Sequence, residues 1–316
     1  MSFTGLALRE ANHVEIISLM DNSVDLLSSS PRVEVKGFRE WARRGNLFPI
    51  AEHGFSMLIR IFDGSTPHSI LFDAGISPRG LLVNARRLGL SLTDVECIVL
   101  SHGHYDHFGG LTAAAGSINR EGLPIFVHDD VFNIRGAINP EGRVRRYPPF
   151  PAEEKVKPAR YVRGRNPRLI ADGLALITGE IPRVTSFEGG YPLHRVYKDG
   201  SWQPDPWIWD DCALVIRLKN KGLVVISGCA HSGIINTLLY ARRISGLNSV
   251  YAVIGGFHLS GKDCEPRIEQ TVKELLKIKP EIVVPCHCTG WRGSYAIARA
   301  MPHAFIHNSV GNLYSF

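Results

Sequence analysis

Residues 101–111 read Ser-His-Gly-His-Tyr-Asp-His-Phe-Gly-Gly-Leu, directly after a largely apolar run over residues 95–100. Imidazole and carboxylate groups are the ligands that suit Zn²⁺, Mn²⁺ and Fe²⁺. His102 and His104 are two residues apart, so they face the same way in an extended segment. Asp106 and His107 follow after a turn and can serve a second metal nearby. Burying four such groups without a partner would carry a large desolvation penalty, so the segment predicts a metal site at the end of a buried strand.

Three later histidines also follow apolar segments that predict strands. His231 lies in Gly-Cys-Ala-His-Ser-Gly, His258 in Gly-Gly-Phe-His-Leu and His287 in Val-Pro-Cys-His-Cys-Thr-Gly. A binuclear site needs more than four protein ligands, so these histidines are candidates for the remaining positions. His258 is either a proton carrier beside the metals or an alternative ligand to His287.

The composition is that of an ordinary globular protein, with 316 residues, 44% hydrophobic and 21% charged. No apolar run approaches the ~20 residues of a membrane span, and the first residues lack the pattern of a signal peptide. We therefore expect no membrane association and a cytoplasmic location. The six cysteines lack the spacing of a disulfide framework or of a separate zinc site, so we expect free thiols.

The net charge of +6 is concentrated in one stretch. Residues 131–170 contain ten Lys or Arg residues against three Glu, together with several prolines. With little helical or strand periodicity, about residues 131–173 predict a long inserted cap, a kind of loop that is usually functional or disordered. The cap is either a solvated surface or a lid whose Arg135, Arg145 and Arg146 bind phosphate or carboxylate. Nucleic acid is not favoured as a partner, because no aromatic residues are interleaved with the charges.

The remaining patterns predict an alternation of strands and helices without a boundary between two cores. We expect strands over residues 54–62, 68–72, 212–218 and 223–227, and helices over residues 78–88, 233–244 and 265–278. The whole chain, residues 1–316, is therefore predicted to be a single domain that carries the inserted cap.

The motif His-x-His-x-Asp-His after a core strand resembles the signature of the metallo-β-lactamase superfamily. The resemblance implies an α+β fold, an αββα sandwich of two mixed sheets with helices outside and metals at one edge. It also implies that His231 completes the first metal position and His287 the second. Asp73, in Asp-Ala-Gly, matches a structural aspartate that braces the metal loop. Cys229 stands where the superfamily has a carboxylate that bridges the metals, and is either a thiolate ligand or a small buried side chain.

Several motifs resemble one branch of this superfamily, which includes the archaeal dihydropterin synthase of methanopterin biosynthesis. They include Glu-His-Gly-Phe-Ser from residue 52, Thr-Gly-Glu-Ile-Pro-Arg from residue 178 and Asp-Asp at residues 210–211. Glu180 stands where the usual pattern has a histidine. Either Glu180 is a ligand or, as we favour, His231 supplies the histidine and Glu180 supports a ligand or binds the substrate. Asp211 is a second substrate-binding candidate.

Three functions remain open at this point. The first is hydrolysis, in which two divalent ions, expected to be zinc with manganese or iron as alternatives, activate a hydroxide against an ester, lactone or phosphoester of an anionic small molecule. Asp106, His258 and His53 would then orient water or carry protons. The second is a synthase-like transfer that joins a pterin-methyl diphosphate to an arylamine and releases pyrophosphate. The third, a metal-binding protein without activity, fits the ligand set least well. A homo-oligomer is compatible with the sequence.

Overall fold

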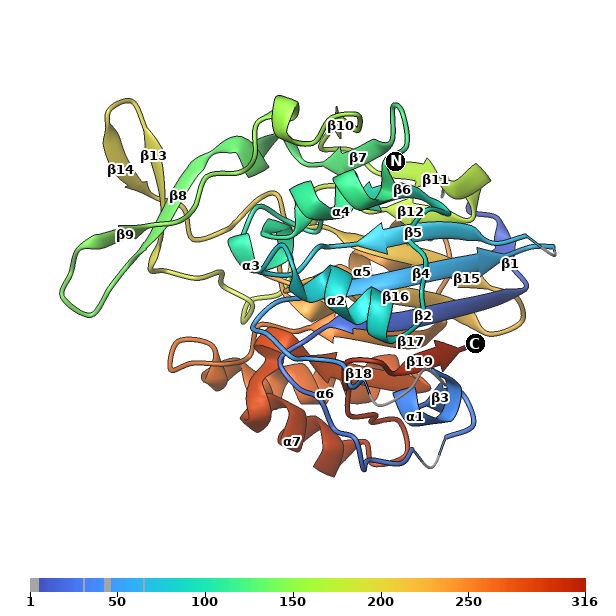
Figure 1. Cartoon of the computed structure of the whole chain (residues 1–316). Helices are drawn as coiled ribbons and strands as arrows, with labels where there is room; N and C mark the ends of the chain where they lie inside the picture. The colour runs from blue at the N-terminus through green and yellow to red at the C-terminus, as the bar shows by residue number, and fades with distance from the viewer. Residues whose placement is uncertain (1–5, 31, 43–46, 65) are drawn as a thin grey trace.

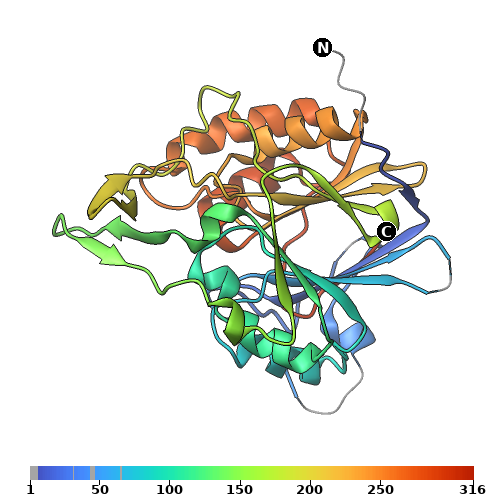
Figure 2. The same cartoon turned by 90° about the horizontal axis from the view of Figure 1, so that it is seen from above.

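The computed structural model of the chain describes residues 6–30, 32–42, 47–64 and 66–316. Two β-sheets pack face to face, and helices cover the outer face of each, so the layers run αββα (Figures 1 and 2). The predicted α+β sandwich is therefore confirmed. Within the described residues, every helix is too short or too polar to cross a membrane.

Sheet A is mixed and is built mainly from the second half of the chain. Its strands follow the order β11 (Arg168–Ile170), β12 (Ala175–Ile177), β15 (Ala213–Leu218), β16 (Gly222–Ser227), β17 (Val250–Gly256) and β18 (Ile282–Cys286), with β1 (Glu10–Ala11) beside β15. The strands β16, β17 and β18 run parallel, so their carboxyl ends lie at the same edge of the sheet.

Sheet B is also mixed and comes mainly from the first half. Its strands follow the order β10 (Arg160–Arg163), β7 (Pro124–Val127), β6 (Val95–Val99), β5 (His68–Phe72), β4 (Ser56–Phe62), β2 (His13–Met20), β19 (Leu313–Ser315) and β3 (Val35–Lys36). The strands β5, β6 and β7 run parallel. Alternate residues of both sheets, such as Ile59, Phe72, Leu214 and Ile254, fill the core between them.

The helices bury one face each against a sheet. Leu81 of α2 and Leu111 of α4 pack on the outer face of sheet B, whereas Leu238 of α5 and Ile297 of α7 pack on that of sheet A. The helices are α1 (Phe38–Trp41), α2 (Gly80–Arg87), α3 (Tyr105–Phe108), α4 (Leu111–Ile118), α5 (Ile234–Ser245), α6 (Ile268–Ile278) and α7 (Gly290–Ala300). Short 3₁₀ helices are η1 (Asp129–Phe132), η2 (Glu153–Lys155), η3 (Ala171–Gly173), η4 (Glu265–Arg267) and η5 (His287–Thr289).

The helical segment that begins within the histidine motif is broken in two. The glycines Gly109 and Gly110 separate α3 from α4, and a Cβ at either position would collide with the backbone of Ile76 or Ala74. The motif loop thus lies directly against the loop that follows β5. This close approach requires glycine.

The segment 131–173 is not one irregular loop. It contains β8 (Ile134–Ile138) and β9 (Val144–Arg146), and then β10 and β11, which join sheets B and A. The two edge strands are short, and each buries a single side chain, Tyr161 or Ile170, beside outward-facing arginines. Those arginines conceal the strand pattern in the sequence.

A third small sheet, called the cap sheet below to distinguish it from the predicted cap over residues 131–173, projects from one end of the sandwich. It pairs β8 and β9 with β13 (His194–Lys198) and β14 (Ser201–Pro204), a hairpin contributed by a later part of the chain. Figures 1 and 2 both show these hairpins extending away from the two main sheets.

Candidate metal centre

Side chains from five strand ends meet at one edge of the sandwich. Asp73 follows β5, the histidine motif follows β6, Cys229 follows β16, His258 follows β17 and His287 follows β18. Because the strands within each sheet are parallel here, their carboxyl ends are neighbours, and the sandwich brings the two edges together.

The first donor cluster consists of His102, His104 and His231. Nε2 of His102 lies 3.0 Å from Nδ1 of His104 and 3.1 Å from Nε2 of His231. Burial lowers the pKa of all three imidazoles well below the ordinary value, so they are neutral. Neutral imidazole nitrogens converging at these distances can hold one divalent ion.

His194 fixes which nitrogen of His104 faces the cluster. Nδ1–H of His194 donates to the carbonyl of Asp205 at 2.9 Å, so its Nε2 accepts from Nε2–H of His104 at 2.9 Å. His104 is thereby left with a free lone pair on Nδ1, the atom that points at His102. Orientation of a ligating histidine through its outer nitrogen is a general feature of metal sites.

The second donor cluster consists of Asp106, His107, His287 and Cys229. Oδ2 of Asp106 lies 3.2 Å from Nε2 of His287 and 3.7 Å from Nε2 of His107. The same His107 nitrogen lies 3.2 Å from Sγ of Cys229. Carboxylate, imidazole and thiolate are all ligands of zinc.

Asp73 and Asn22 orient the two histidines of this cluster. Oδ2 of Asp73 accepts from Nδ1 of His107 at 2.7 Å, and the amide oxygen of Asn22 lies 3.2 Å from Nδ1 of His287. Both rings therefore present Nε2 to the cluster. Burial opposes protonation of His107, but Asp73 and Asp106 outweigh it and raise its pKa to about 9, so an incoming cation must displace a proton.

Two features show that the residues fit bound metal. The buried Nε2 of His287 has no hydrogen-bond partner although it points at Asp106. Asp73, His258 and His287, each within two residues of a strand end, have positive φ angles of 58°, 44° and 48°, a backbone conformation that is uncommon outside glycine but that Asp and His adopt more readily than most residues. The donor atoms and the backbone around them are thus arranged to hold cations.

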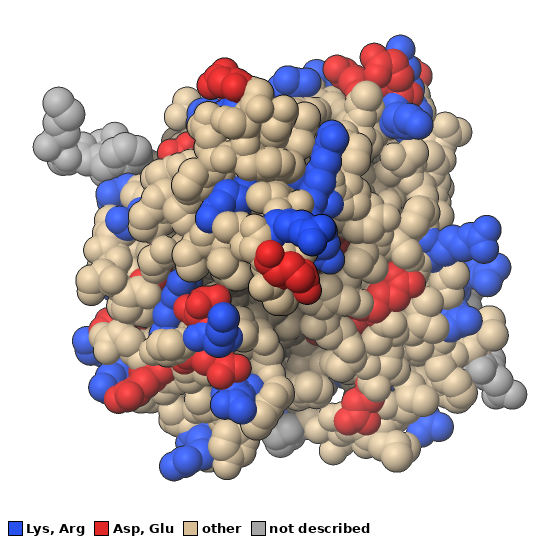
Figure 3. Space-filling view, turned by 90° about the vertical axis from the view of Figure 1, so that its left-hand side faces the viewer, with Lys and Arg blue, Asp and Glu red and all other residues tan. Residues whose placement is uncertain are grey.

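A cavity of about 730 Å³ opens above both clusters. Asp106, His104, Cys229 and His231 lie on its floor, and strand β9 of the cap sheet contributes to its wall. The remaining lining residues that carry a charge or a large ring are His53, Tyr105, Arg145, Arg146, Tyr147, Tyr191, His258, Lys262 and Asp263. Figure 3 faces this end of the molecule and shows basic side chains with acidic ones among them, so the surface is not uniformly basic.

His53 and His258 flank different clusters. Nε2 of His53 lies 3.5 Å from Oδ2 of Asp106, and the His53 side chain is 65% exposed. The ring of His258 lies 4.2 Å from that of His231. Both line the cavity, so both predicted proton carriers are placed where a substrate would reach them.

Two predicted substrate-binding residues are instead buried. Nη1 and Nη2 of Arg135 donate to Asp210, at 2.7 and 2.6 Å, and Asp210 accepts from the amide of Gly103 at 2.7 Å. Asp211 accepts from the backbone and side chain of Ser232, at 2.9 and 2.5 Å. These groups brace the loops of the first cluster and do not reach the cavity.

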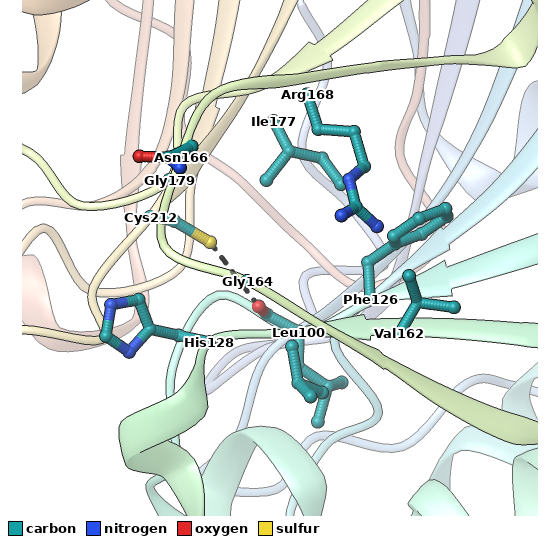
Figure 4. A pocket seen from close by; sticks show the side chains of 11 residues that line it. Leu100, Phe126, His128, Val162, Gly164, Asn166, Arg168, Ile177, Gly179 and Cys212 are labelled. Atoms are coloured by element: carbon teal, nitrogen blue, oxygen red, sulfur yellow. Dashed lines mark hydrogen bonds between the residues drawn. The ribbon is translucent and has the colours of Figure 1, made fainter.

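Glu180 belongs to neither donor cluster, and its role as a substrate-binding residue stays a prediction. Its carboxylate is 3.4 Å from Nε2 of His128 and 3.3 Å from Arg165. His128 lines a separate pocket of about 20 Å³ between the two sheets (Figure 4), where Sγ of Cys212 contacts the carbonyl of Leu100. This space is sufficient for about one water.

The comparisons with known proteins agree with this geometry. Residues 50–119 match the family model of the metallo-beta-lactamase superfamily. The chain is 33% identical over 277 residues to the 7,8-dihydropterin-6-methyl-4-(beta-D-ribofuranosyl)-aminobenzene-5'-phosphate synthase of Methanocaldococcus jannaschii, which covers 84% of this chain and 90% of the relative. The chain belongs to the metallo-β-lactamase superfamily, in the branch that includes this archaeal synthase.

Solved structures of the superfamily share the fold. Tm1679, a metal-dependent hydrolase, aligns with a TM-score of 0.69 and 28% identity over 95% of this chain and 98% of its own. The metallo-β-lactamase fold protein YhfI from Bacillus subtilis aligns with a TM-score of 0.52 and 12% identity over 96% of this chain and 100% of its own. Members of the superfamily typically bind metal ions, and the clusters described above are the candidates for that role in this chain.

Proposed function

We propose that the chain is a binuclear-metal-dependent hydrolase that cleaves an ester, lactone or phosphoester bond of an anionic small molecule. The observation that carries the proposal is the pair of donor clusters on the floor of one cavity. Cys229 lies between them, since its Sγ is within 4.8 Å of donor atoms of His102 and His107 and also of His231. We expect zinc, because imidazole and thiolate dominate the donor set.

Two divalent ions, when bound, would supply Lewis acidity to the scissile group and a nucleophilic water at neutral pH. The protein's part is to hold the reacting groups and to move protons. Asp106 faces the cavity and can orient a water through its carboxylate. His53, beside Asp106 and open to solvent, can exchange protons between the site and bulk water. His258 can serve a leaving group on the side of the first cluster.

The cavity wall supports an anionic substrate that carries a flat ring. Arg145 and Arg146 of β9 and Lys262 supply positive charge, and an arginine fork suits phosphate or carboxylate. The ring of Tyr147 lies 5.6 Å from that of His104. Burial raises the pKa of Tyr147 to about 12, so its phenol stays neutral and can both stack and donate a hydrogen bond.

A synthase-like transfer is the second candidate. The observation that favours it is the 33% identity over 277 residues with the archaeal synthase. In such a reaction, metal ions held by the same clusters would bind the diphosphate of a pterin-methyl diphosphate. An arylamine would attack in place of water. Arg145 and Arg146 would bind the negatively charged part of either substrate.

The experiment that tests the proposal combines metal analysis with a substrate panel. Purified protein is loaded with Zn²⁺ and assayed against a phosphodiester, a lactone, a thioester and a pterin-methyl diphosphate with and without arylamine. Hydrolysis that is lost in His104→Ala, and retained in the exposed control His303→Ala, supports the hydrolase. Pyrophosphate release that depends on the arylamine, without hydrolysis of any ester, would replace it with the transferase.

A further inference from the structure

A second thiol lies beside the second donor cluster. Donor atoms of Cys229, His287 and Cys288 all lie within 4.8 Å of one another, and Cys288 lines the cavity. A Zn–S bond is about 2.3 Å long, so two thiolates on one ion are at most about 4.6 Å apart. The two thiols and His287 are therefore close enough to bind a single ion with small side-chain movements.

The backbone turns at His287 so that the two cysteines around it face different environments. Cys286 ends β18 inside the core between the sheets. His287 then adopts its positive φ of 48°, and Cys288 emerges on the cavity side with its Sγ 3.5 Å from the carbonyl of Cys229. The two cysteines thus do not form a pair with each other, and Cys288 is directed to Cys229.

The end of β17 leaves room for this thiol. A Cβ on Gly256 would lie 2.6 Å from Sγ of Cys288 and 3.2 Å from Cα of Cys229, so a larger residue there would displace Cys288. The buried, unpartnered Nε2 of His287 independently indicates a ligand at this position.

We propose that Cys288 is a second thiolate ligand of the second metal position, together with Cys229, and that this pair makes the position select a thiophilic ion such as Zn²⁺ over Mn²⁺ or Mg²⁺. The inference rests on the metal centre of the proposed function. Soft thiolate ligands favour zinc, whereas manganese and magnesium prefer oxygen donors. Each thiol loses a proton to solvent when it binds. Asp106, Cys229 and Cys288 then contribute three negative charges against the four positive charges of two divalent ions.

The direct test counts sulfur ligands in the wild-type protein and in Cys288→Ser. Reduced, metal-free protein is loaded with two equivalents of Zn²⁺ and studied by zinc X-ray absorption. Cys288 adds one half of a sulfur to the average per zinc in either case: the average is one with it and one half without it if Cys229 binds one ion, and one and a half with it and one without it if Cys229 bridges both ions. The same average in the wild type and in Cys288→Ser would overturn the inference.

Cobalt substitution assigns the sulfurs to residues. With Co²⁺, the thiolate-to-metal charge-transfer band should fall by about one third to one half in Cys288→Ser, by about one half to two thirds in Cys229→Ser, and vanish in the double variant; the unequal values apply if Cys229 bridges both ions. Cys264→Ser, a cavity-lining cysteine outside the cluster, is the matched control and should keep the full band. Thermal unfolding of each metal-free variant checks that the fold is retained.

The outcomes separate this inference from the proposed function. If Cys288→Ser keeps the full band while Cys229→Ser removes it, the assignment of Cys288 as a metal ligand is wrong. The proposed binuclear metal centre is unaffected by that result. If wild-type protein binds neither Zn²⁺ nor Co²⁺ under reducing conditions, the metal centre itself fails, and this inference with it.

Discussion

Replacing Asp73 by asparagine is expected to weaken the second metal position selectively. Oδ1 of Asp73 accepts from the amide of Ser101 at 2.7 Å, and Oδ2 accepts from the hydroxyl of Ser101 and from Nδ1 of His107, each at 2.7 Å. Whichever way an amide side chain lies, its NH₂ group faces a hydrogen-bond donor of Ser101 or His107. The substitution keeps the shape of the side chain and removes only its charge and acceptor capacity.

The size of the effect follows from the bond that is lost. Asp73 is fully buried, and a hydrogen bond to a charged group contributes about 1.5–3 kcal/mol. Since each 1.4 kcal/mol is tenfold in affinity, the dissociation constant of the second ion should rise about 10–100-fold, the range typical of groups that orient a metal-binding histidine. The first ion should be affected less, because Asp73 reaches the ligand His102 only through the hydroxyl of Ser101, which lies 2.9 Å from Nδ1 of His102.

The assay is a chelator competition titration followed by elemental analysis of metal per chain. Asp172→Asn is the matched control, because Asp172 also has a positive φ, of 50°, but its side chain is 79% exposed. Thermal unfolding of the metal-free variants separates loss of metal from loss of fold. Wild-type affinity for both ions in Asp73→Asn, with the fold intact, would refute the assigned role of Asp73.

Three further perturbations test other parts of the account. Arg145→Ala combined with Arg146→Ala should raise KM for an anionic substrate about tenfold or more and leave metal content unchanged. Kinetics no different from those of Arg143→Ala would show that Arg145 and Arg146 do not bind substrate. His194→Phe should weaken the first metal position about 10–100-fold, as measured by chelator competition, and unchanged affinity would contradict its role in orienting His104. Burial raises the pKa of Glu188 to about 7 from an ordinary 4.5, despite hydrogen bonds from the amides of Ile235 and Asn236. The folded state therefore binds this proton more tightly than the unfolded chain, so the free energy of unfolding should fall, by at most about 3 kcal/mol, as the pH rises from about 4.5 to about 7. Denaturant titrations should show that slope in the wild type and not in Glu188→Gln.

The sequence predicted the fold and most of the donor clusters because their signals are local. The motif around His102 follows an apolar strand, and His231 and His287 occupy the same position after theirs. Strand ends of parallel strands meet at one edge, so a pattern read separately at each strand also brings the residues together in space. The structure places His102, His104, Asp106, His107, His231, His287 and Cys229 together, as the sequence suggested.

The residues that sequence reasoning misplaced depend on distant partners. His194 is 90 positions from His104, and nothing in its own neighbourhood marks it as a residue that orients a ligand. Arg135 looked like its basic neighbours, but a buried Asp210 takes up its guanidinium. Cys288 was passed over because cysteine pairs were sought by spacing along the chain, whereas Cys229, whose carbonyl oxygen Sγ of Cys288 contacts, is 59 positions away.

The most direct test of the account is the metal stoichiometry of the purified protein after loading with Zn²⁺ and removal of free ion. The account predicts about two ions per chain in the wild type. His104→Ala should lose the first ion, His287→Ala should lose the second, and the exposed control His303→Ala should keep both. Full occupancy in both cluster variants, or no bound metal in the wild type after loading with Zn²⁺, Mn²⁺ or Fe²⁺, would contradict the assignment of these clusters as a binuclear centre.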